Sequence, residues 1–132
     1  MLLQEYDGRV RLVFKDMPLP FHDLAKPAHE AARCAGAVGR YWAYHDRLFA
    51  EQPAFEREDL VRYADELGLD RTAFVRCLDE RPFRAAVEAD MAQAQALGIN
   101  GTPTFIVNGQ KLVGAHPLET FRTIIDDALK TR

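Results

Sequence analysis

The 132-residue sequence has few cysteines, no long apolar run and no excess of basic charge. It contains no stretch near the roughly 18 consecutive apolar residues that a membrane-spanning helix needs, so membrane insertion is not expected. Its formal net charge is -3 at pH 7, and its Lys and Arg residues are scattered along the chain. Nucleic-acid-binding domains usually carry a basic patch, so the sequence does not indicate nucleic acid as a partner.

Only two cysteines are present, Cys34 and Cys77, and they lie too far apart to form a Cys-x-x-Cys motif. Two such cysteines leave two alternatives open, a pair of buried thiols or a disulfide bond. The four histidines include no pair at i, i+4 spacing with a carboxylate partner. We therefore expect neither a metal site nor a bound cofactor.

The first residues do not resemble a signal peptide, because they include neither a basic region nor a long apolar stretch. Taken as written, the chain would be cytoplasmic. Residues 2–6 are typical of the last turn of a helix that ends at Gly8. A chain that opens on the last turn of a helix is expected to be truncated at its N-terminus.

Residues 9–15 are short, partly alternating and rich in β-branched side chains, which predicts a strand. From Leu24 to about Leu97, apolar residues instead recur at helical spacing between glycines and prolines, which predicts a block of helices. Asp70 is expected to cap one of these helices, and Asp16 is expected to be a solvated surface charge. The aromatic residues of the block are expected in its core; they are Tyr41, Trp42, Tyr44 and Phe49.

Strand patterns return after the helical block. Residues 104–107 and 111–114 flank Asn108-Gly109, a strong signal for a two-residue hairpin turn. Pro117 then opens an amphipathic stretch that predicts a final helix. The expected order is therefore strand, helical block, hairpin and helix.

Several stretches carry a family resemblance. Gly101-Thr102-Pro103-Thr104-Phe105, followed by a hairpin and a last helix, is similar to the proline loop of the thioredoxin superfamily. Residues 10–22 resemble the second core strand and exit loop of DsbA-like thiol:disulfide oxidoreductases. Residues 32–49, 67–70 and 77–79 are similar to the opening and middle of the helical insertion in that family. The resemblance covers essentially the whole chain.

This resemblance implies an α/β, thioredoxin-like fold with a helical insertion. Residues 1–23 and 99–132 would form an incomplete thioredoxin-like core, and residues 24–98 the inserted helical domain. In the family, a strand and a Cys-x-x-Cys pair at a helix N-terminus precede the point where Met1 falls, so an N-terminal truncation is expected. Without that dithiol the usual site has no nucleophile, and no catalytic residue is expected.

The resemblance also gives roles to particular residues. Thr102 and Pro103 would be substrate-binding residues, joined by a cis peptide bond, with the backbone of Thr102 offered to an extended peptide or protein substrate as an added strand. Cys34 and Cys77 match a second, non-catalytic disulfide of some family members. Such a bond would place the parent protein in the periplasm or another extracytoplasmic compartment.

Three functions stay open from the sequence. The first is a redox-inactive member of the thiol oxidase lineage, and the second is a non-catalytic peptide-binding module. The third, a glutathione-linked isomerase or transferase, is disfavoured because those relatives tend to have Val-Pro where this chain has Thr102-Pro103. Because the missing strand would lie between residues 10–14 and 105–107, two strand edges are expected to be exposed. We expect the chain to close this gap, to form a homodimer through the exposed edges, or to be poorly soluble.

Overall fold

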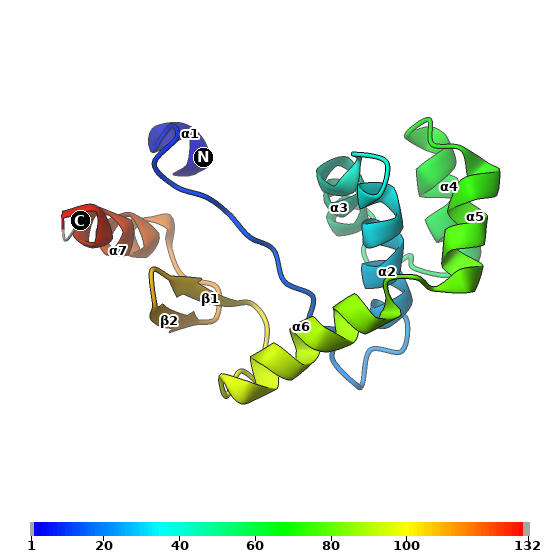
Figure 1. Cartoon of the computed structure of the whole chain (residues 1–132). Coiled ribbons are helices and arrows are strands. Elements are labelled where there is room, and N and C mark those ends of the chain that lie inside the picture. The colour runs from blue at the N-terminus through cyan, green and yellow to red at the C-terminus, as the bar shows by residue number, and fades with distance from the viewer. Residues whose placement is uncertain (1, 131–132) are drawn as a thin grey trace. The chain divides into compact units, whose positions relative to one another are not determined.

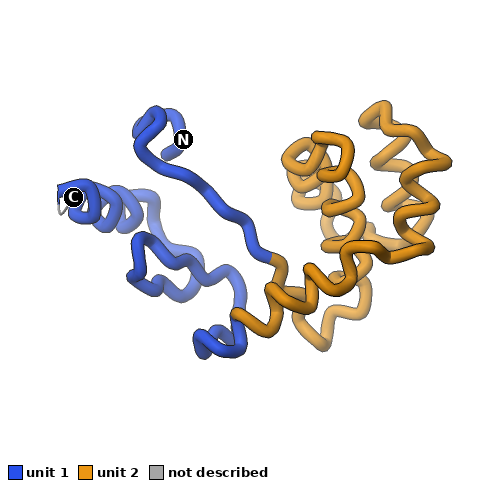
Figure 2. Tube along the Cα trace, in the orientation of Figure 1, with its two compact units in different colours: residues 1–15, 94–132 blue, residues 16–93 orange. Residues whose placement is uncertain are grey.

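The computed structural model describes residues 2–130 and divides into two compact units (Figure 2). The sheet unit comprises residues 1–15 and 94–132, and the helical unit comprises residues 16–93. Asp16, the first residue of the helical unit, hydrogen-bonds to two of its helices. The assignment of residues 1–23 and 99–132 to a thioredoxin-like core, and of residues 24–98 to an inserted domain, stays a prediction.

Short helices make up the helical unit, as the periodicity predicted. They are α2 (Ala25–Gly36), α3 (Tyr41–Ala50), α4 (Arg57–Glu66), α5 (Arg71–Glu80) and α6 (Arg84–Ala96), the last of which crosses the boundary at 93/94 (Figure 1). Asp70 caps α5 as expected, since its Oδ1 accepts a hydrogen bond of 3.2 Å from the N–H of Ala73. Helix α6 begins at Arg84, two residues later than Pro82 suggested.

The core of the helical unit lies between α2 and the three helices that follow it. Ala31 and Ala35 of α2 are fully buried, and their small side chains let neighbouring helices approach closely. The side chains of Tyr44 and Tyr63 lie in the core between these helices and are fully buried. Each phenol donates a hydrogen bond to a carbonyl oxygen, Tyr44 to Leu60 at 2.8 Å and Tyr63 to Ala54 at 2.7 Å. The buried hydroxyls are thereby satisfied.

The aromatic residues of α3 do not all enter that core, and this corrects the sequence expectation. Tyr44 is buried, but Trp42 and Phe49 are 45% and 57% exposed. At about 100° per residue, positions 42 and 44 lie on opposite sides of a helix, so both side chains cannot face inward. The side chain of Leu48, four residues after Tyr44, takes the second inward position.

The sheet unit holds α1 (Leu2–Glu5), β1 (Thr104–Val107), β2 (Gln110–Val113) and α7 (Leu118–Lys130) (Figure 1). The strands pair antiparallel with Val107 opposite Gln110, which confirms the predicted hairpin. Asn108 and Gly109 form the turn with φ of 51° and 93°, the positive values that a type I′ turn requires. The rings of Phe105 in β1 and Phe121 in α7 pack edge to face, with their centroids 4.8 Å apart.

Helix α1 is fastened to α7 by polar contacts. The Tyr6 hydroxyl, just after α1, donates a 2.7 Å hydrogen bond to Asp126 Oδ1. Arg122 contacts Glu5 through both Nε and Nη2, at 2.9 and 2.6 Å. These bonds join residues from opposite ends of the sequence, so α7 supports α1 as well as β1.

The predicted strand at residues 9–15 is wrong, because this segment is extended but pairs with no other strand of the described residues (Figure 1). Within the described residues, Val10 to Val13 make no backbone hydrogen bond. Leu12 and Val13 are 49% and 55% exposed. Alternating β-branched residues favour the extended backbone, but a strand also needs a neighbour to complete its hydrogen-bond ladder, and residues 2–130 supply none here.

Candidate substrate-binding site

The loop that carries Thr102 and Pro103 connects α6 to the first strand. Its Thr102–Pro103 peptide bond is cis, and a second cis bond joins Gln52 to Pro53. The carbonyl oxygen of Pro103 accepts a 2.8 Å hydrogen bond from the N–H of Gly114, which follows β2. On the other side, Thr104 Oγ1 donates to the carbonyl of Gly101 at 2.8 Å. The loop is thus held at both of its ends.

The backbone of Thr102 has no hydrogen-bond partner within residues 2–130. Neither its N–H nor its carbonyl oxygen makes a hydrogen bond to any residue between 2 and 130. Both Thr102 and Pro103 are exposed. An exposed residue with a free donor and acceptor, two positions before the first residue of a strand, can pair with the backbone of an extended ligand.

Helix α7 supplies the rigid support for this loop. Strand β1 begins directly after Pro103, and Phe105 anchors that strand to Phe121 of α7. Ile125 of α7 is buried one turn further along. A binding loop mounted on a packed strand and helix keeps its backbone groups in a fixed direction, which lowers the entropy lost on binding.

The two cysteines of the sequence form one disulfide bond. The sulfur atoms of Cys34 and Cys77 are 2.09 Å apart, and the Cα atoms are 6.0 Å apart. This bond joins α2 to α5 inside the helical unit, and Cys34 is buried. It agrees with the pairing that the resemblance implied. Since no free cysteine remains, the chain offers no thiolate for disulfide exchange while this bond is intact.

A buried charge network lies in the helical unit, and the sequence analysis missed it. Asp16 is only 2% exposed, which corrects the expectation of a solvated surface charge. Its Oδ1 lies 2.7 Å from His29 Nδ1, and its Oδ2 accepts a hydrogen bond of 2.5 Å from Arg33 Nε. Arg33 Nη2 and the N–H of Asp16 both donate to Asp90 Oδ2, at 2.9 and 2.8 Å. The spacing of His29 and Arg33, four residues apart on one helix face, is the only local signal that could have suggested this network.

The network shifts the pKa values of Asp16 and of the neighbouring Tyr41. Burial by itself would raise the pKa of Asp16, but hydrogen bonds from His29 and Arg33 outweigh it, so the pKa lies below its ordinary value of 3.8. Burial raises the pKa of Tyr41 to about 12, and the charge of Asp16 adds to this effect. At neutral pH, Asp16 is therefore ionised and the Tyr41 phenol is protonated.

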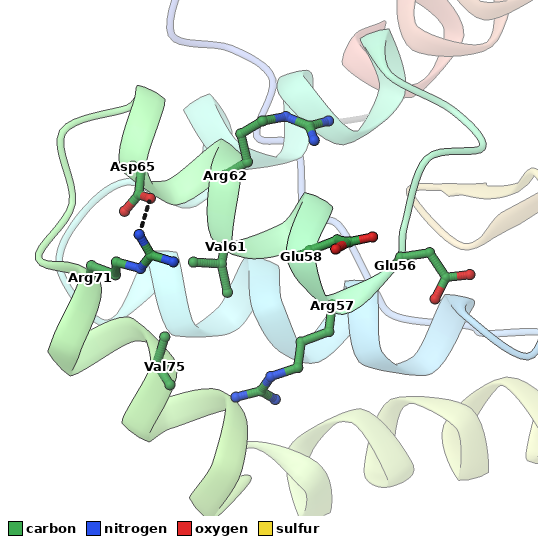
Figure 3. Close-up of a pocket in the computed structure, with 8 residues that line it drawn as sticks. All are labelled: Glu56, Arg57, Glu58, Val61, Arg62, Asp65, Arg71 and Val75. Carbon is green, nitrogen blue, oxygen red and sulfur yellow. Dashed lines mark ion pairs between the residues drawn. The ribbon is translucent and has the colours of Figure 1, made fainter.

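A shallow depression on α4 and α5 is a second surface feature (Figure 3). Its lining is mainly charged, with Val61 and Val75 between the charges; the residues are Glu56, Arg57, Glu58, Val61, Arg62, Asp65, Arg71 and Val75. Arg71 pairs with Asp65 at 3.4 Å, and Arg57 pairs with Asp79 at 2.6 Å. With Arg57 and Arg71 already paired to neighbouring carboxylates, the depression indicates no particular ligand. Within residues 2–130, no three His, Cys, Asp or Glu side chains converge as metal ligands would.

Comparison with known proteins agrees with this architecture. A family model described as Thioredoxin matches residues 1–127. The crystal structure of a thioredoxin-like oxidoreductase from Silicibacter pomeroyi DSS-3 matches with a TM-score of 0.85 and 32% sequence identity, covering 97% of this chain and 73% of that one. The fold is therefore the thioredoxin-like fold with a helical insertion, as the sequence predicted. The chain belongs to the thioredoxin family.

Curated relatives match over a small part of their own length. A Na(+)/H(+) antiporter NhaA from Herminiimonas arsenicoxydans is 39% identical over 108 residues, which is 82% of this chain and 17% of that protein. The antiporter NhaA 3 from Salinispora tropica is 36% identical over 128 residues, 96% of this chain and 20% of that protein. The chain thus spans about a fifth of the length of these relatives. Among residues 2–130, no helix combines the length and apolar character needed to cross a bilayer.

Proposed function

We propose that this chain belongs to the DsbA-like thiol oxidoreductase lineage and binds extended polypeptides at Thr102 and Pro103 without exchanging disulfides itself. The observation that carries the proposal is the unpaired backbone of the exposed residue Thr102, two residues before β1. An extended peptide can add to this residue as a short strand, with hydrogen bonds to its N–H and carbonyl oxygen.

We expect no disulfide exchange because of the cysteines that these 132 residues contain. They include no Cys-x-x-Cys, and both cysteines are consumed in the bond that joins α2 to α5. A buried bond in a helical packing interface differs from a catalytic one, which needs an accessible sulfur and a nearby thiolate. The same bond supports an extracytoplasmic location for the protein, because structural disulfides persist in oxidising compartments.

The experiment uses alkylated insulin B chain, an extended polypeptide without free thiols, and measures its binding by fluorescence anisotropy. Thr102→Pro removes the backbone N–H that the ligand would use, whereas Thr102→Ala keeps it and removes only the side chain. We expect saturable binding that is lost in Thr102→Pro and retained within about twofold in Thr102→Ala, since the backbone carries the contact. Circular dichroism of both variants establishes that they are folded.

Two outcomes would contradict the proposal. One is the absence of saturable binding by the unaltered chain. The other is equal binding by the two folded variants, which would show that the backbone of Thr102 takes no part.

A further inference from the structure

Two links join α2 to α5, which pack against each other in the helical unit (Figure 1). The first link is the Cys34–Cys77 disulfide. The second is an ion pair between Glu30 on α2 and Arg81, the residue directly after α5. Glu30 precedes Cys34 by four residues, and Arg81 follows Cys77 by four. Because residues four apart lie on the same side of a helix, the two links lie one turn apart along one seam between the helices.

The ion pair makes two parallel hydrogen bonds. Arg81 Nε donates to Glu30 Oε1 at 3.1 Å, and Arg81 Nη2 donates to Glu30 Oε2 at 2.8 Å. Glu30 is only 5% exposed although it carries a charge, so water and salt screen the pair weakly. A bidentate contact of this kind fixes both the distance and the orientation of its two groups. We refer to this pair as the Glu30–Arg81 clamp.

The backbone of Arg81 connects the clamp to the disulfide. Its N–H donates a 3.0 Å hydrogen bond to the carbonyl oxygen of Cys77, which closes the last turn of α5. The φ of Arg81 is 52°, in the left-handed region where glycine is the usual residue after a helix. An arginine in this conformation costs backbone energy that glycine would not, and the two hydrogen bonds to Glu30 are what a glycine here would lose.

The clamp does not depend on the disulfide, so it also acts when that bond is broken. In the reduced chain, only non-covalent contacts hold Cys34 opposite Cys77. The hydrogen bonds of the clamp, one turn away, restrict the sliding of α2 against α5. Thiols restricted in this way have a high effective concentration toward each other, because they lose less freedom when they bond.

We infer that Glu30 and Arg81 are positioning residues for the disulfide, and that they keep Cys34 and Cys77 in register in the reduced chain. The bond therefore re-forms readily after reduction and resists small thiols. This inference concerns the helical unit alone and does not rest on peptide binding at Thr102.

Oxidation of the reduced chain by glutathione disulfide takes two exchanges. Cys77 is the less buried cysteine, so its thiolate attacks glutathione disulfide, forms a mixed disulfide and releases one glutathione. The Cys34 thiolate then attacks the sulfur of Cys77 and releases the second glutathione. Two electrons pass from the protein thiols to glutathione disulfide, and the two thiol protons end on the released glutathione molecules. The clamp acts on the second exchange, because that step is intramolecular.

The test equilibrates the 132-residue chain in buffers of reduced and oxidised glutathione, quenches by alkylation, and measures the reduced, mixed-disulfide and oxidised forms by mass spectrometry. Arg81→Gly removes the guanidinium and suits the left-handed backbone, and Glu30→Gln removes the carboxylate charge. In each variant we expect the equilibrium constant for disulfide formation to fall about tenfold, which is about 30 mV for a two-electron couple, and the mixed disulfide to accumulate. Arg81→Lys keeps the charge without the parallel hydrogen bonds and should give an intermediate value.

Two control variants separate positioning from a general loss of stability. Arg57→Ala removes an exposed ion pair of 2.6 Å between α4 and α5, and Tyr63→Phe removes a buried hydrogen bond to Ala54. Both should leave the glutathione equilibrium unchanged within about twofold, since neither residue joins α2 to α5. Circular dichroism establishes that each variant is folded in both redox states. An unchanged equilibrium in folded Arg81→Gly and Glu30→Gln, or an equal fall in the controls, would overturn the inference.

Discussion

Arg33 Nε lies 2.5 Å from Asp16 Oδ2, and this contact fixes the residue at which the chain enters the helical unit. The other guanidinium arm of Arg33 contacts Asp90 on α6, a short distance in sequence before the chain leaves that unit. One arginine on α2 therefore binds a residue near each end of the helical unit. A buried carboxylate stays ionised only when such partners compensate for its lost hydration.

Removal of Asp16 is expected to destabilise the helical unit. Asp16→Ala leaves Arg33 and His29 without their buried partner, and breaking a buried pair in this way costs about 3 kcal/mol. Urea unfolding followed by the fluorescence of Trp42, the only tryptophan in the sequence, measures the change. Asp23→Ala, at an exposed aspartate in the following loop, is the matched control and should leave the free energy of unfolding nearly unchanged. Equal effects of the two substitutions would contradict the assigned role of Asp16.

Acid should weaken the same network. The pKa of Asp16 is lower in the folded state than in the unfolded chain, so the unfolded chain binds more protons at acidic pH. Its contribution is fully present above the unfolded pKa and is lost as pH falls through the lower, folded pKa, so the loss lies in the acidic range that begins near the ordinary value of 3.8. Asp16→Asn should therefore show a shallower loss of unfolding free energy over this interval. Identical pH dependence in the two proteins would remove Asp16 as a source of acid sensitivity.

The disulfide is expected to be structural. Its removal by the double substitution Cys34→Ala and Cys77→Ala should lower the free energy of unfolding by up to about 4 kcal/mol, because the bond restricts the unfolded chain. Urea unfolding of the oxidised protein, the reduced protein and the double variant provides the measurement. Reduction should reproduce the effect of the double variant in the unaltered chain and have no effect on the variant itself. A disulfide that can be reduced without loss of stability would argue against a structural role.

Local patterns predicted most of the fold. Glycines and prolines separated the helices, Asn108-Gly109 set the hairpin, and Asp70 capped α5. The extended segment at residues 9–15 was mistaken for a strand because local sequence encodes backbone extension and not the presence of a neighbouring strand. The network around Asp16 escaped detection because Asp90, one of its members, lies 74 residues away.

The candidate site, like the fold, was predicted only in part from the sequence. Thr102 and Pro103 were predicted as substrate-binding residues through a family resemblance carried by a short motif, and that role stays a prediction. Cys34 and Cys77 could be paired only through a family resemblance, because spacing alone does not distinguish a disulfide from two buried thiols. The exposure of Trp42 follows from which side of α3 meets α2, a property of packing rather than of the local sequence.

The reduction of insulin by dithiothreitol, followed as turbidity, tests most directly whether this polypeptide binds substrate without exchanging disulfides. Samples contain the 132-residue chain, the double cysteine variant or no added protein. The account expects neither protein to precipitate insulin faster than the sample without protein, while the chain still binds alkylated B chain. A rate well above the uncatalysed one with the unaltered chain, abolished in the double variant, would make Cys34 and Cys77 a redox site and contradict the account.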